Sequence, residues 1–196
     1  MMLSRWISFF ILVLATSACI QLQGSAPVNR YFLLEPMTEA DNIYSYDTLS
    51  ASIEVVDFPD YLRRTQVVVQ QRDNILHFSD SQRWATTLED NIVTVLRSNL
   101  EQLIPHATIT IGPWQGSRTD DKRLQLSVRK FTGILGQRSD VDIRWRITSI
   151  DGKEYSGSFV HQQVIDDSYE DLIRALNLGL EELSKELVTV LVKPGA

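Results

Sequence analysis

Hydrophobic residues recur at helical spacing in two long stretches of the chain. The first stretch places Trp84, Leu88, Ile92, Leu96, Leu100 and Leu103 three or four positions apart. The second stretch contains Leu172, Ile173, Leu176, Leu180, Leu183, Leu187 and Leu191. Residues at this spacing form one apolar stripe along a helix. The pattern predicts amphipathic helices from Gln82 to Leu103 and from Tyr169 to Val192, capped by Ser79-Asp80-Ser81 and by Asp166-Asp167-Ser168.

Shorter segments around these helices have the patterns of β-strands. In residues 141–148, apolar and polar side chains alternate, as they do in a strand with one buried and one wet face. Asp151-Gly152 follows and predicts a hairpin turn. Phe131 is out of phase with the alternation that begins at Leu124, which predicts a bulge near Lys130. Further strands are predicted at 30–34, 52–58, 67–71, 75–78, 108–111 and 154–165.

The order of these elements is strands, helix, strands, helix. Each amphipathic helix must bury its stripe, and the strands need a partner for one face. The sequence therefore predicts an α/β fold that is three-layer-like, with a mixed β-sheet packed by the two long helices.

The N-terminal region has a different pattern. An apolar run from Trp6 to Ala15 follows Arg5 and precedes small residues, which is the pattern of a secretory signal peptide. The run is shorter than the roughly 20 apolar residues that cross a bilayer. Cys19 comes directly after it and is the only cysteine, so no internal disulfide can form. We expect a signal peptide over 1–18, a tether over 19–29 and a single domain over 30–196.

The position of Cys19 resembles the lipobox of bacterial lipoproteins, in which the signal is removed before the cysteine and the sulfur receives lipid. That family usually has Leu three residues before the cysteine, where this chain has Thr16. The resemblance implies a covalent lipid on Cys19, and two or more acyl chains hold a protein firmly to a membrane. Ile20, in place of Asp, resembles an outer-membrane address in enterobacteria. The alternative is an ordinary cleaved signal with an incidental cysteine.

Composition and charge exclude several classes of function. The net charge of −6 argues against nucleic-acid binding, which needs a basic stripe. The histidines His77, His106 and His161 share no motif with a nucleophile or with paired metal ligands. Asp120-Asp121 and Asp166-Asp167 are explained by a solvated loop and a helix cap. The sequence therefore predicts a protein that is not an enzyme and has no cofactor and no metal.

Several motifs occur together in a fixed order along the chain. They are Tyr31-Phe32-Leu33-Leu34, Pro59-Asp60-Tyr61-Leu62-Arg63-Arg64, Arg83-Trp84-Ala85, Asn99-Leu100, Pro105, Pro113-Trp114 and Tyr169-Glu170-Asp171-Leu172. This series resembles the ABC-type transport auxiliary lipoproteins, the PqiC/YmbA family. Each motif alone is weak, and their order and spacing carry the resemblance.

The resemblance implies a function that composition and periodicity do not. It implies a lipid-anchored periplasmic domain on the inner leaflet of the outer membrane, often as a homo-oligomer. Its expected partner is a mammalian-cell-entry (MCE) type transport protein of a system that moves lipids between the envelope membranes. The chain would dock this complex at the outer membrane and contribute to envelope integrity.

Two groups of residues are candidate contacts with a partner or a second subunit. The first group is the turn formed by Pro59, Asp60, Tyr61, Leu62 and Arg63. The second group is Arg144 and Arg146, which could meet an acidic partner segment or lipid headgroups. The alternatives are a plain connecting turn and a solvated sheet face.

Two other functions remain open at this point. A lipid-anchored periplasmic hydrolase would require a nucleophile beside His77 or His161 in space. A carrier that encloses a lipid would require an apolar cavity of some hundreds of Å³.

Overall fold

The computed structural model describes residues 28–40, 44, 49–113 and 122–192. The predicted signal peptide, Cys19 and most of the predicted tether lie outside these residues. The strands are β1 (Arg30–Phe32), β2 (Leu49–Asp57), β3 (Gln66–Gln70), β4 (Leu76–Trp84), β5 (Ala107–Ile111), β6 (Lys122–Ile134), β7 (Arg138–Ser149) and β8 (Glu154–Val164). The α-helices are α2 (Leu88–Leu103) and α3 (Tyr169–Leu191), and two short 3-10 helices span Asp60–Leu62 and Arg72–Asn74. The predicted α/β class with two long helices is confirmed.

The larger sheet has five strands in the order β5-β2-β6-β7-β8. β2 pairs in parallel with β5 and β6, and β6, β7 and β8 form antiparallel neighbours. The register of β6 and β7 shifts between Val128 and Lys130, which confirms the predicted bulge. Gly152 adopts a φ of +83° between β7 and β8, as the predicted hairpin turn requires.

The remaining strands form a second sheet in the order β1-β4-β3. Its presence corrects the predicted start of the first helix, because residues from Gln82 to Trp84 pair with β1 and cannot be helical. The helix begins at Leu88, and the side chain of Thr87 accepts a hydrogen bond from the Asp90 amide as its cap. The second helix begins at Tyr169 with Ser168 as its cap, as the sequence predicts.

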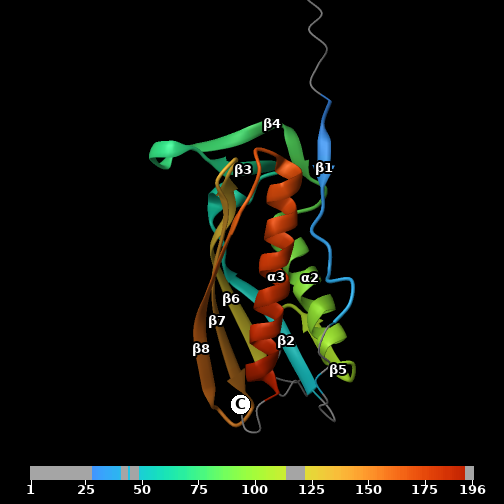
Figure 1. The fold of residues 1–196 in the computed structure, drawn as a ribbon. Coiled ribbons are helices and arrows are strands. Elements are labelled where there is room, and N and C mark those ends of the chain that lie inside the picture. The colour runs from blue at the N-terminus through green and yellow to red at the C-terminus, as the bar shows by residue number, and fades with distance from the viewer. Residues whose placement is uncertain (1–27, 41–43, 45–48, 114–121, 193–196) are drawn as a thin grey trace, which may run out of the picture.

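Both helices cover the same face of the larger sheet (Figure 1). Their apolar stripes and the inward side chains of the sheet form one hydrophobic core. Ile53, Ile143 and Leu180 in this core have no solvent exposure. The opposite face of the sheet is covered by β3 at one end, where the buried Thr132 hydroxyl donates to the backbone oxygen of Val68 at 2.7 Å. We call the rest of this face, around Arg144 and Arg146, the open face.

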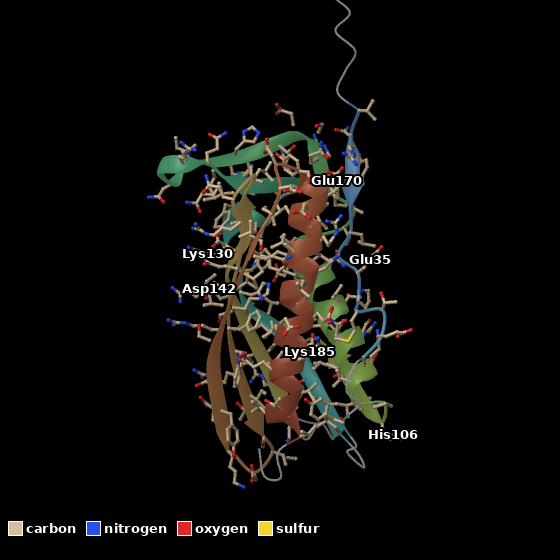
Figure 2. All side chains as sticks on the ribbon, viewed as in Figure 1. Glu35, His106, Lys130, Asp142, Glu170 and Lys185 are labelled. Atoms are coloured by element: carbon tan, nitrogen blue, oxygen red, sulfur yellow. The ribbon has the colours of Figure 1, made fainter. Side chains whose placement is uncertain are left out.

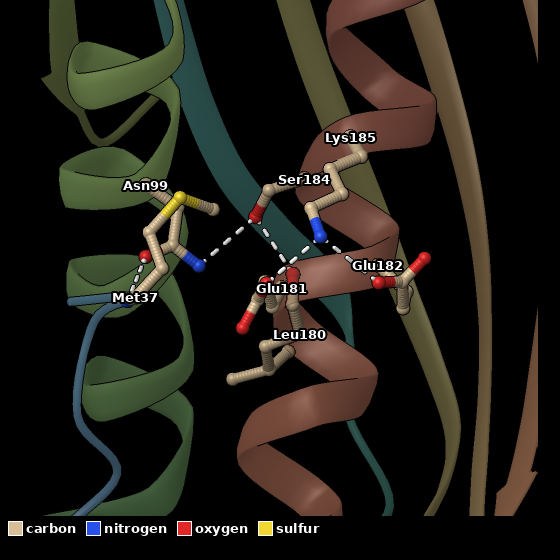
Figure 3. A network of polar contacts seen from close by, with 7 residues as sticks. All are labelled: Met37, Asn99, Leu180, Glu181, Glu182, Ser184 and Lys185. Carbon is tan, nitrogen blue, oxygen red and sulfur yellow. Dashed lines mark hydrogen bonds and ion pairs between the residues drawn. The ribbon is translucent and has the colours of Figure 1, made fainter. Parts of the chain in front are cut away.

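The N-terminal segment from Leu33 to Met37 lies on the outer side of the two helices (Figure 1). Asn99 of α2 accepts a hydrogen bond from the Met37 amide (Figure 3), and Asn177 of α3 accepts one from the Glu35 amide. The helix pair therefore lies between the larger sheet and this segment, and the smaller sheet lies at one end of the molecule. Among the described residues, neither helix is long and apolar enough to span a membrane.

Candidate functional site

Side chains of the open face are aligned in rows that run across the strands. Arg144 on β7 lies between Ser127 on β6 and Ser158 on β8 in the register. Arg146 lies in the same way between Gln125 and Ser156. Because side chains two residues apart on a strand point to the same face, both arginines emerge on the open face. This alternation is the pattern from which the sequence predicted a wet face.

Most acidic groups near these arginines already have a partner. The Nε of Arg123 and the Nε2 of Gln125 donate to Oε1 of Glu54, at 2.8 and 3.0 Å. The carboxylate of Asp142, which is labelled in Figure 2, lies 3.7 Å from the guanidinium of Arg129.

Arg144 and Arg146 differ in their ion pairs. Arg146 lies 3.2 Å from the carboxylate of Glu154. Arg144 is exposed and forms no ion pair with the described residues. A groove of about 650 Å³ passes over both arginines, and its lining includes Val56, Ser127 and Ser158. The groove presents guanidinium, amide and hydroxyl donors, so it suits an acidic ligand.

The predicted contact turn lies beside the same face. Asp60–Leu62 forms a short 3-10 helix, and Leu62 is buried beneath it. The hydroxyl of Tyr61 donates to the backbone oxygen of Arg129 on β6, at 3.4 Å. Partial burial raises the pKa of Tyr61. The structure thus brings the turn and β6 together, which the sequence alone did not show.

Arg63 joins the turn to the start of α2. Its guanidinium forms an ion pair with Glu89 and stacks over Phe58, 5.4 Å from the ring centre. A second groove, of about 500 Å³, lies here and is lined by Phe58, Arg64, Trp84 and other residues. The Pro59–Arg64 and Arg83-Trp84-Ala85 motifs, which are distant in sequence, therefore meet around one groove. Their common location is a feature that sequence reasoning missed, although both motifs had been singled out.

The three histidines lie on different parts of the fold. His77 is on β4, His161 is on β8, and His106 follows α2 at the far end of that helix (Figure 2). Within the described residues, no hydrogen bond joins any of them to a serine, threonine or carboxylate. The described residues also contain no group of His, Cys, Asp and Glu that could hold a metal ion.

Comparisons with known proteins found matches that cover most of the described residues. Residues 31–188 match the model of a family described as "ABC-type transport auxiliary lipoprotein component". The comparison with curated proteins found no match.

Among the solved structures that share this fold, two match over most of the chain. A crystal structure of an uncharacterized protein has 21% identity and a TM-score of 0.68, and the match covers 83% of this chain and 98% of that chain. A DUF330 protein from Xanthomonas campestris has 13% identity and a TM-score of 0.69, with 83% and 94% covered. At these identities, the likeness concerns the fold alone.

Proposed function

Because the chain belongs to the family of ABC-type transport auxiliary lipoprotein components, we propose that it is a non-enzymatic, lipid-anchored docking component of such a system at the outer membrane. The family match carries this proposal, because it begins at β1 and ends within α3 and so covers the described body from end to end. The resemblance found in the sequence is thereby confirmed. The family also identifies the chain as a lipoprotein of the cell envelope and an auxiliary part of a transport system.

The finer parts of the proposal are the anchor, the partner and the assembly. Lipid on Cys19 holds the body to the inner leaflet of the outer membrane. An MCE-type transport protein of the same system is the partner, and several copies of the chain assemble. The proposed contact surfaces are the open face and the turn formed by Pro59, Asp60, Tyr61, Leu62 and Arg63. On the open face, Arg144 and Arg146 supply the positive charge.

Two observations favour docking over catalysis and over lipid carriage. The three histidines lie on different parts of the fold, and His77 and His161 do not form the histidine–nucleophile pair that the hydrolase hypothesis required among the described residues. The space between the helices and the larger sheet is filled by side chains such as Leu126 and Leu187, which have no solvent exposure. A lipid would have to displace this core, which is packed like the interior of other proteins.

The anchor and the partner are tested together in native membranes. We expect wild-type protein to carry lipid at its mature N-terminus, by intact mass, and to co-purify with an MCE-type protein after cross-linking. The Cys19→Ser variant should lack the lipid mass and move to the soluble periplasmic fraction. Absence of any MCE-type protein from cross-linked wild-type membranes would overturn the assigned partner.

The contact surface is tested with arginine variants that keep the anchor. Arg144→Ala combined with Arg146→Ala should weaken co-purification, and the remaining binding should become less sensitive to salt. Arg174→Ala is the matched control, because Arg174 is an exposed arginine on α3, on the other side of the molecule. Equal loss in both variants would argue against the open face as the contact.

A further inference from the structure

The last strand of the larger sheet has an edge that no described strand covers. β8 pairs with β7 on one side and forms the outer boundary of the sheet on the other (Figure 1). The pairing of β7 and β8 runs without a register shift from Glu154 to Val164. The edge is therefore long and regular.

Proteins usually protect such an edge with charges, prolines or bulges, because its free backbone groups can pair with another chain. β8 has none of these devices beyond its first residue. From Tyr155 to Val164 it contains no Asp, Glu, Lys, Arg or Pro. Val160 and Val164 are 63% and 83% exposed on it. A strand of another chain can therefore pair along this edge.

The other boundary of the same sheet has matching properties. β5 pairs only with β2 among the described strands, contains no charged residue and exposes Ile111 by 44%. β5 and β8 also run in the same direction, because β2 is parallel to β5 and β6 and two antiparallel steps separate β6 from β8. The β8 edge of one copy could therefore pair with the β5 edge of another copy.

We propose that the edge of β8 is the interface with a second copy of this chain, paired strand to strand. A strand without charged side chains can pair with β8 or with β5 of another copy without placing like charges opposite each other. Both arrangements extend the sheet across the interface and carry the open face from one copy to the next. A second copy supplies a suitable strand in either arrangement, because its own β8 and β5 lack charged side chains from Tyr155 to Val164 and from Ala107 to Ile111.

This inference deepens the self-assembly included in the proposed function, and it is tested without reference to the transport partner. A photo-cross-linking amino acid replaces Val160 in the full-length chain in native membranes, and the products are identified by peptide mass spectrometry. We expect a product of two or more copies, cross-linked to β8 or β5 of the neighbour. The matched control is the same substitution at Ile75, which is 56% exposed and lies outside the larger sheet.

Several outcomes would overturn the proposal. They are no self-product at Val160, an equal yield at Val160 and Ile75, a product with another protein only, or a cross-link to a second copy outside β5 and β8. The same experiment in the Cys19→Ser background separates the two proposals. If the interface lies in the folded body, the Cys19→Ser protein should still give the cross-link between β8 and a second copy. This result is expected even if the proposed transport function is wrong.

A charge placed on the edge gives an independent readout. Val160→Lys should shift the detergent-solubilised protein to the mass of a single copy by light scattering, whereas Ile75→Lys should not. Circular dichroism checks that both variants are folded. A Val160→Lys protein that is folded and assembles like wild type would overturn the proposal.

Discussion

At the scale of single residues, two buried asparagines hold the N-terminal segment on the helices. Asn91 accepts from the Leu34 amide at 2.8 Å and donates to the Leu34 oxygen at 3.1 Å. Asn99 accepts from the Met37 amide at 2.9 Å and donates to the Ser184 hydroxyl at 3.1 Å (Figure 3). These contacts connect the segment that leads to the predicted anchor with both helices of the body.

Replacing Asn91 tests how much this connection contributes. Asn91→Ala leaves the buried amide and oxygen of Leu34 without partners, and each unsatisfied group costs about 1–3 kcal/mol. We expect the free energy of unfolding to fall by about 2–4 kcal/mol in urea titrations. Asn177→Ala is the control, because its bond to the Glu35 amide is solvent-exposed, and it should cost less than about 1 kcal/mol. Similar losses in both variants would contradict the assigned role of Asn91.

Tyr61 makes stability depend on pH at the alkaline end. Burial raises its pKa in the folded protein, so the folded state binds more protons than the unfolded state once the pH exceeds the usual tyrosine value of about 10. Stability contributed by the neutral hydroxyl is therefore fully present below that pH and is lost as the pH rises through the folded pKa. Tyr61→Phe should lose less stability than wild type between pH 8 and about pH 11, by denaturant titration. Parallel pH curves for the two proteins would contradict this assignment.

At the scale of elements, local patterns predicted what local interactions determine. The alternation in residues 141–148 predicted β7 and its open face, and the caps around Ser168 predicted the start of α3. The start of α2 was predicted wrongly, because Ser79, Asp80 and Ser81 have the residue types of helix caps but lie in β4. The pairing of β4 with β1, a strand some fifty residues earlier, overrides that local preference.

The candidate site was predictable in part for the same reason. The sequence placed Arg144 and Arg146 on one sheet face through their spacing alone. It could not place Tyr61 against β6, or the turn beside Trp84, because those contacts join segments that only the fold brings together. The division of the strands into two sheets is likewise a long-range property that no local pattern records.

Two substitutions compare the observed and the predicted cap of α2. Thr87→Ala removes the side-chain acceptor for the Asp90 amide, and loss of such a cap costs about 0.5–2 kcal/mol. Asp80→Ala changes an exposed position of β4 and should alter the free energy of unfolding by less than about 0.5 kcal/mol. Thermal and urea denaturation measure both effects. A larger loss in Asp80→Ala than in Thr87→Ala would place the start of the helix where the sequence had predicted it.

At the scale of the whole molecule, the proposed lipid anchor on Cys19 would limit where the body can lie. Cys19 and Arg30 are eleven positions apart, and an extended chain spans at most about 3.3–3.6 Å per residue. With lipid on Cys19, Arg30 lies no more than about 40 Å from the membrane surface. β1, with which the described strands begin, lies beside β4 at one end of the molecule (Figure 1), so the smaller sheet is the part of the body closest to Cys19 along the chain.

The membrane that holds this anchor is tested at the residue after the cysteine. Ile20 resembles an outer-membrane address, and an Asp at this position favours retention in the inner membrane of enterobacteria. We expect Ile20→Asp to move the lipidated protein to inner-membrane fractions in a sucrose gradient, whereas Ile20→Ser should stay with the outer membrane. Mass measurement must show the same lipid on both variants, because only then does the change of membrane reflect the address.

A docking component acts at one membrane, so moving it to the other membrane should impair it as much as loss of the anchor does. In the Ile20→Asp variant the body is folded, lipidated and within the same reach of a bilayer, but that bilayer is the wrong one. Envelope integrity should therefore fall as far as in Cys19→Ser, by detergent sensitivity, while Ile20→Ser remains like wild type. If cells with the protein in the inner membrane kept the detergent resistance of wild type, the function of the protein would not depend on the outer membrane.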